Sequence, residues 1–444
     1  MLPFLTLLSL APVLFAGDGA RTRTADLRRL EEWIELEQSF TEAARAAAHA
    51  AVAAHLERGT ELTDAAFYLE VRRIVALADN GHSNVDDTPI FERFGLVPLR
   101  TYWFSDGLFV VRARAEQRSL LGARIEGVEG RTLAELEDRL AALAGGTREY
   151  FRHYSAALLL LSPALMHAAG LAERPDRLRL ALVDARGEPR EVVLATDPDA
   201  RAFRARPWRA LNPRPIEGGA DWAAFHASDV EPPLWLQEED EPFRYVLLAD
   251  GALAYVQLRG NRDAGGQRIR DFTARTVERL QQDEPRSIVL DNRQNGGGDL
   301  TTTADFALEL PSFVQPGGRV YVLTGNGTFS AGIYTSYFPR ASDPENTLVV
   351  GEPVGDRAEF WAEARGPFAL PESGFGIGYA LQRHDLLRGC TVLPECHMAQ
   401  YPAHWNLVVA TLAPDLEVPT TFADFAAGRD PVLERVLGEE AGRR

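Results

Sequence analysis

The chain has 444 residues, of which 45% are hydrophobic, and a formal net charge of -17 at pH 7. This length exceeds that of one small domain, so we expect two or three folded units with sizeable cores. The acidic balance argues against a nucleic-acid surface, which needs clustered positive charge, and leaves proteins, peptides or small molecules as the expected partners.

The first segment, residues 2–16, is an apolar run that ends in small residues at Ala16 and Gly17. Such a run is typical of the core of a secretory signal peptide and is short for a membrane span. We therefore predict a signal peptide over residues 1–16 and export to the periplasm or the extracellular space. Because no Arg or Lys precedes the apolar core, an uncleaved membrane anchor is the alternative.

Residues 17–97 are predicted to form a helical cap, with helices over 27–55 and 64–78 and Thr63 as the N-cap of the second. Asn80 and Gly81 end that helix, and His82 follows on a loop. Imidazole is the side chain whose ordinary pKa suits proton transfer near neutral pH. His82 is therefore a candidate base, although a loop histidine can also be merely solvated.

The middle of the chain changes to short strands and then to a connector. Strands at 107–112 and 122–127, followed by a helix at 132–143, predict a small β-rich module over 98–145. The rest of this region, 146–242, is predicted to hold a buried apolar segment, a hairpin and a proline-rich connector.

From residue 243 onward strands and helices alternate, which predicts a parallel sheet covered by helices. The expected strands are 253–258, 287–290, 320–323 and 347–350, and the expected helices are 266–281, 299–308 and a segment after Ser330. Active loops of such sheets gather beyond the carboxyl ends of the strands. We expect the loop 291–298 and the turn before Ser330 to lie there.

Ser330 follows a buried strand and the glycine turn 325–327, where a helix begins. A serine nucleophile needs a base and donors aimed at the oxyanion. We predict that Ser330 attacks, that His82 is its base, and that the N–H groups of Gly297, Gly298 and Ala331 stabilise the oxyanion. The other interpretation is an N-terminal helix cap, for which serine is common.

Cys390 and Cys396 are the only two cysteines. In an exported chain this spacing predicts a disulfide that closes a short loop. His397 and His404 lie nearby, but the pattern is not a standard zinc spacing, so we expect no metal and no cofactor.

Several motifs together resemble the C-terminal-processing, or tail-specific, serine peptidases and the related tricorn-core branch. The motifs are Asp79-Asn-Gly-His-Ser83, similar to D-x-G-H-[TS]; Leu290-Asp-Asn-Arg-Gln-Asn-Gly-Gly-Gly298, similar to D-x-R-x-N-x-G-G; the turn Thr328-Phe-Ser-Ala331; Val350-Gly-Glu-Pro-Val-Gly355; and Ala413-Pro-Asp-Leu-Glu-Val418. Their shared order and spacing carry the resemblance.

The resemblance implies a ClpP/crotonase-like α/β catalytic domain over 243–444, with a degenerate PDZ-like module over 98–145 that captures an extended peptide by strand addition. It implies a serine endopeptidase with a polypeptide substrate. We expect no nucleic-acid partner, and we expect contact with a membrane only if the first segment is uncleaved.

The family's common lysine base is impossible here, because the chain contains no lysine and arginine stays protonated. The resemblance therefore points to the histidine-using branch, with Glu363 as the best-matched acid behind His82. Asp356, Glu359 and Asp385 compete with Glu363 for that role, and Ser83 is a candidate to position the imidazole.

Two alternatives belong to other classes. A serine esterase would use Ser330 with His384, His397 or His404, but the G-x-S-x-G elbow is not met. A non-catalytic peptide- or ligand-binding protein would keep the fold without the chemistry.

Overall fold

The structure is a computed structural model that describes residues 20–59, 61–197, 199, 207–215, 221–227, 229–363 and 368–443. The predicted signal peptide lies outside these residues. Among the described residues, no helix combines the length and the apolar character that crossing a membrane requires.

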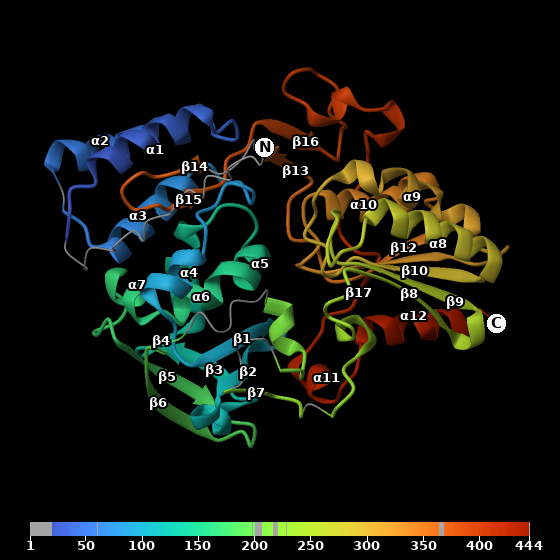
Figure 1. Cartoon of the computed structure of the whole chain (residues 1–444), viewed down its shortest axis with the longest axis horizontal. Coiled ribbons are helices and arrows are strands. Elements are labelled where there is room, and N and C mark those ends of the chain that lie inside the picture. The colour runs from blue at the N-terminus through green and yellow to red at the C-terminus, as the bar shows by residue number, and fades with distance from the viewer. Residues whose placement is uncertain are drawn as a thin grey trace, which may run out of the picture.

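Three helices open the described chain: α1 (Thr24–Leu36), α2 (Glu42–Arg58) and α3 (Asp64–Ala76). The Thr63 hydroxyl accepts a hydrogen bond from the Ala66 N–H, so the predicted N-cap of α3 is confirmed. The short strands β14 (Phe368–Ala369) and β15 (Gly376–Ile377) return to these helices (Figure 1) and share their hydrophobic core. The amino-terminal part and a late segment of the chain therefore pack as one unit.

The second layer is a seven-stranded sheet whose strand pairs are antiparallel. Its strands are β1 (Leu99–Phe104), β2 (Gly107–Arg114), β3 (Arg124–Val128), β4 (Arg131–Thr132), β5 (Arg177–Val183), β6 (Pro189–Ala195) and β7 (Trp222–Ala224). The helices near it are α4 (Leu133–Leu140), α5 (Arg148–Phe151), α6 (Ala157–Leu160) and α7 (Pro163–Ala168). Because β5 pairs with β3, the sheet extends beyond the predicted module 98–145.

The third layer is a six-stranded sheet in the order β17-β12-β11-β10-β9-β8, parallel except for the β8 edge. Its strands are β8 (Phe243–Leu248), β9 (Leu253–Leu258), β10 (Ser287–Asp291), β11 (Val320–Thr324), β12 (Thr347–Gly351) and β17 (Leu416–Glu417). The predicted parallel sheet is therefore present. The central strands are buried on both faces, which explains their continuous apolar runs.

Helices cover both faces of this sheet (Figure 1). One core contains side chains of α8 (Ile269–Asp283), α9 (Ala304–Glu309) and α10 (Ala331–Ser342), and a second contains side chains of α12 (Pro431–Ala441). Beyond the sheet, β13 (Glu359–Ala362) pairs antiparallel with β16 (Gln382–Asp385), and α11 (Phe422–Ala426) precedes α12. The β13–β16 ribbon carries several of the site residues described next.

Candidate active site

Ser330 lies immediately before α10 and has φ 55° and ψ -129°. Non-glycine residues rarely adopt a positive φ, and such strained positions cluster at functional sites. The Ser330 hydroxyl makes no hydrogen bond to the first turn of α10, so the side chain does not cap the helix. It lines a cavity of about 380 Å³ together with Gly298, Glu363, His384 and other residues.

The glycine loop, residues 291–298, comes very close to Ser330. A Cβ on Gly297, which has φ +86°, would lie 2.7 Å from the Ser330 Cβ and 3.0 Å from the Ala331 nitrogen. The Gly297 N–H donates to Asn295 Oδ1 at 3.0 Å, so this predicted oxyanion donor is already engaged. Among the described residues, the N–H groups of Gly298 and Ala331 have no acceptor and remain free for an oxyanion.

A buried charge cluster fixes the start of the glycine loop. Arg293 donates to Asp291, at the end of β10, and to both carboxylate oxygens of Asp430, at 2.8 Å each. Asp430 also accepts from the Leu433 N–H and so caps α12. Burial tends to raise the pKa of Asp291, but Arg293 outweighs burial and lowers that pKa below its ordinary value.

His82 lies between two phenylalanine rings. Its ring centre is 4.4 Å from that of Phe329, the residue before Ser330, and 5.2 Å from that of Phe360. His82 Nδ1 is 3.5 Å from Oδ2 of the buried Asp356. Neither ring nitrogen of His82 makes a hydrogen bond within the described part of the chain, so the Ser330–His82 hydrogen bond of a ready dyad is not formed here.

Ser83 acts on the loop and not on the imidazole. Its hydroxyl donates to Glu37 Oε2 at 2.6 Å and accepts from Asn80 Nδ2 at 2.9 Å. Asn80 also donates to the Trp361 carbonyl, at 3.0 Å. These contacts attach the histidine loop to α1 and to β13, and they position His82 through the backbone.

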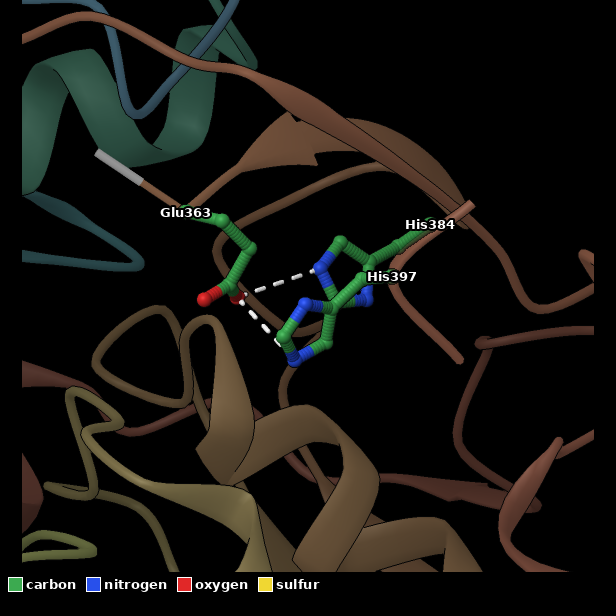
Figure 2. Close-up of side chains that lie close together, drawn as sticks. All are labelled: Glu363, His384 and His397. Carbon is green, nitrogen blue, oxygen red and sulfur yellow. Dashed lines mark ion pairs between the residues drawn. The ribbon is translucent and has the colours of Figure 1, made fainter. Parts of the chain in front are cut away.

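Glu363 lies against two other histidines (Figure 2). Its Oε1 is 3.3 Å from His384 Nε2 and 3.7 Å from His397 Nε2. The structure therefore pairs the predicted acid with His384 and His397 and places Asp356 beside His82. The sequence did not link either histidine to Glu363, because no local spacing connects positions 363, 384 and 397.

Burial and charge set the protonation of this cluster. Burial lowers the pKa of His384 to about 4 and also lowers the pKa of His397. Burial tends to raise the pKa of Glu363, but the adjacent His384 and His397 outweigh burial, so that pKa lies below its ordinary value. The cluster at neutral pH is therefore a carboxylate with two neutral imidazoles. Nδ1 of His384 contacts the Tyr334 hydroxyl at 3.0 Å, whereas Nε2 faces Glu363 at 3.3 Å without forming a hydrogen bond.

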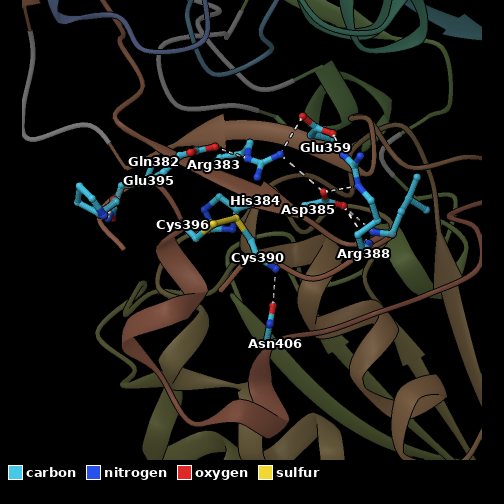
Figure 3. Close-up of a disulfide and its surroundings, with 12 residues drawn as sticks. Glu359, Gln382, Arg383, His384, Asp385, Arg388, Cys390, Glu395, Cys396 and Asn406 are labelled. Carbon is cyan, nitrogen blue, oxygen red and sulfur yellow. Dashed lines mark hydrogen bonds and ion pairs between the residues drawn. A yellow bond between two sulfur atoms is a disulfide. The ribbon is translucent and has the colours of Figure 1, made fainter. Parts of the chain in front are cut away.

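The disulfide lies next to this cluster. Cys390 and Cys396 are bonded to each other, and His384 lies beside the bond in the close-up (Figure 3). The Arg383 N–H donates to the Glu395 carbonyl at 2.8 Å, which holds β16 beside the segment before His397. Both links bring residue 397 close to residue 384.

Comparison with solved structures finds similar folds. Mature CPAF matches with a TM-score of 0.52 at 13% sequence identity, over 92% of this chain and 94% of that chain. Its complex with lactacystin matches with a TM-score of 0.52 at 13% identity, over 92% and 95%. The photosystem II D1 C-terminal processing protease gives a TM-score of 0.40 at 14% identity, over 93% and 98%.

No protein-family model matches the chain, and the comparison with curated proteins found no match. At these identities, the similarity to mature CPAF shows a common mixed α/β fold. The histidine-using branch, the crotonase-like description and the PDZ-like module stay predictions.

Proposed function

We propose that this protein is a serine peptidase that cleaves a polypeptide through an acyl-enzyme formed on Ser330. One observation carries the proposal. The Ser330 hydroxyl does not cap α10 although its backbone has a strained positive φ, and Gly298 and Ala331, whose N–H groups are free among the described residues, line the same cavity. A strained serine beside unpaired backbone donors is the arrangement that acyl transfer requires.

His82 is the proposed base, and Asp356 takes the orienting role that the sequence assigned to Glu363. With Nδ1 facing Asp356, the Nε2 atom is the nitrogen available to Ser330. Catalytic hydrogen bonds are often long in an enzyme without substrate and tighten in the complex. The buried Asp356 carboxylate would hold the tautomer and stabilise the imidazolium.

The proposed reaction has two steps, acylation of Ser330 and hydrolysis of the acyl-enzyme. The Ser330 Oγ attacks the carbonyl carbon while its proton moves to His82 Nε2, and the oxyanion accepts hydrogen bonds from Gly298 and Ala331. The imidazolium gives that proton to the leaving amine as the C–N bond breaks. A water, deprotonated by His82, hydrolyses the ester and restores the Ser330 hydroxyl.

A polypeptide substrate is favoured by the cavities on the glycine loop. Gly298 lines the cavity of about 380 Å³, and Gly296 lines a larger one of about 560 Å³. The larger cavity is rich in aromatic side chains, among them Tyr102, Tyr150 and Tyr154. An extended chain that crosses the loop would reach both cavities, whereas a small ester would occupy only one.

The test is labelling with a fluorophosphonate probe, followed by digestion of a peptide library. We expect the unaltered protein to be labelled, Ser330→Ala to lose the label, and Ser342→Ala, at the exposed end of α10, to keep it. Equal labelling of Ser330→Ala and of the unaltered protein would show that Ser330 is not the nucleophile. A peptide library left intact by a labelled protein would favour an esterase.

A non-catalytic binding protein is the second candidate. The absent His82 hydrogen bond is the observation that favours it. An unaltered protein that stays unlabelled but binds library peptides would establish it.

We further propose that the protein is exported. The Cys390–Cys396 disulfide supports this location, because disulfides persist in oxidising compartments. Detection of the tagged protein in the cytosolic fraction alone would contradict it.

A further inference from the structure

We propose that Glu363, His384 and His397 bind a divalent transition-metal ion, for which Zn²⁺ is the probe. The ligands would be a Glu363 carboxylate oxygen and the Nε2 atoms of the two histidines, which converge on one point (Figure 2). From the sequence, a metal is considered only around Cys390, Cys396, His397 and His404 and none is expected, so the set Glu363, His384 and His397 is new.

The separations of the donor atoms fit such an ion. Zinc binds nitrogen and oxygen at about 2.0–2.1 Å, so two ligands at a tetrahedral angle lie about 3.3 Å apart. Glu363 Oε1 is 3.3 Å from one Nε2 atom and 3.7 Å from the other, and all three donor atoms lie within 4.8 Å of one another. Small side-chain shifts would therefore complete the coordination.

A buried nitrogen that lacks a hydrogen bond points into the site. His384 is 2% exposed, and its Nε2 makes no hydrogen bond of good geometry despite the ion-pair distance to Glu363. A buried polar atom left in this way is costly, and a metal ion bound between the imidazole and the carboxylate would satisfy both.

The far side of each imidazole ring has a polar partner. His384 Nδ1 is 3.0 Å from the Tyr334 hydroxyl, and His397 Nδ1 is 3.0 Å from Gln382 Oε1 and 3.1 Å from Gln400 Nε2. When Nδ1–H donates to these oxygens, each Nε2 presents its lone pair to the site. Outer hydrogen bonds of this kind fix the tautomer and orientation of metal-binding histidines.

The backbone supports the same three residues. His384 is on β16, which a backbone hydrogen bond and the disulfide beside it hold against the segment that leads into His397. Glu363 follows β13, the partner strand of β16, and has the strained φ of 70°. Strain at a carboxylate aimed at two histidines is consistent with a functional position.

The donor set selects the class of ion. Two imidazoles with one carboxylate suit zinc, copper, iron or nickel, whereas calcium and magnesium prefer oxygen ligands. The ion would lie in the wall of the cavity that Ser330 also lines. Metal binding does not depend on the proposed peptidase activity, so Ser330→Ala should bind Zn²⁺ with unchanged affinity.

The experiment is calorimetric titration of tag-free, chelator-treated Ser330→Ala protein with Zn²⁺, repeated with Mg²⁺. We expect one Zn²⁺ per chain and no saturable Mg²⁺ binding. Glu363→Gln, His384→Gln and His397→Gln should each weaken Zn²⁺ binding at least tenfold. Co²⁺ should give visible d–d absorption that Glu363→Gln abolishes.

The matched controls are two histidines outside the cluster. His55→Gln removes another close histidine–glutamate pair, since His55 Nε2 is 3.0 Å from Glu70, and His404→Gln removes an exposed histidine. Neither should change the affinity. If the buried His384→Gln variant fails to fold, as judged by circular dichroism, the test rests on the more exposed Glu363→Gln, which replaces the carboxylate by a carboxamide of similar volume.

Two results would overturn the metal site. One is the lack of saturable Zn²⁺ binding by the folded parent protein. The other is binding that Glu363→Gln and His397→Gln leave unchanged while His55→Gln or His404→Gln weakens it. Either would leave Glu363 as a carboxylate beside two neutral imidazoles.

Discussion

The imidazole of His82 lies at 10° to the ring of Phe360, with 5.2 Å between the ring centres. Phe360 also stacks on His384, at 8° and 4.7 Å. One aromatic side chain therefore contacts two histidines that have different carboxylates: Asp356 beside His82 and Glu363 beside His384.

Asp356→Asn should reduce kcat/KM for a peptide substrate by about 10³-fold or more, because the amide would no longer hold the His82 tautomer or stabilise its charge. Glu363→Gln, assayed without added metal, should change kcat/KM less than about tenfold. Steady-state kinetics of both folded variants measures the difference. The reverse order of effects would return the acid's role to Glu363.

Gly297→Ala should abolish fluorophosphonate labelling, because its Cβ would lie 2.7 Å from the Ser330 Cβ. Gly317→Ala is the matched control: its φ of +80° is similar, but a Cβ there meets nothing within 4 Å. Both variants should lose on the order of 1 kcal/mol of unfolding free energy from the positive φ. Only Gly297→Ala should lose the label, and equal labelling of the two variants would contradict the close approach.

Arg293→Met should lower the free energy of unfolding by about 3–5 kcal/mol, because it leaves the carboxylates of Asp291 and Asp430 buried without their partner. Arg435→Met removes only a surface pair with Glu439 and should cost less than about 1 kcal/mol. Urea unfolding of the three proteins at one pH checks the comparison. Similar midpoints for both variants would show that the buried cluster adds little.

His153 should make the protein less stable as the pH falls from 6.5 toward 4. Burial lowers the pKa of His153 from its ordinary 6.5 to about 4, so in this window the unfolded chain binds a proton that the folded chain does not. The loss reaches at most about 3 kcal/mol. Urea unfolding at pH 7 and pH 4.5 measures it.

The variant His153→Phe keeps a ring beside Tyr102 and Tyr154 and should lose part of this pH dependence. His404→Gln, at an exposed position, should retain the whole dependence. An unchanged pH dependence in His153→Phe would assign the effect to other groups.

The sequence predicted the elements with local signals. The N-cap of α3, the apolar strands of the parallel sheet and the position of Ser330 between β11 and α10 follow from capping chemistry and from periodicity. The partner of Glu363 had no such signal. It depends on the register of β13 with β16, which pairs Ala362 with Gln382 across a long connection.

The extent of the seven-stranded sheet also depends on a long-range pairing. The sequence predicts a hairpin in this region, and β5 pairs with β6 as expected, but the addition of β5 to β3 is a long-range pairing that the sequence pattern does not encode. The predicted boundary at residue 145 consequently falls inside one continuous sheet.

The Arg293 cluster also bears on the order of events during synthesis. Arg293 begins the glycine loop, yet Asp430, which binds its guanidinium, is translated 137 residues later. A nascent chain that has already produced the histidine loop, the glycine loop and Ser330 still lacks this partner. If the site is a peptidase, its oxyanion donors would reach their final positions only after α12 begins to emerge from the ribosome, and the chain would be protected from its own activity until then.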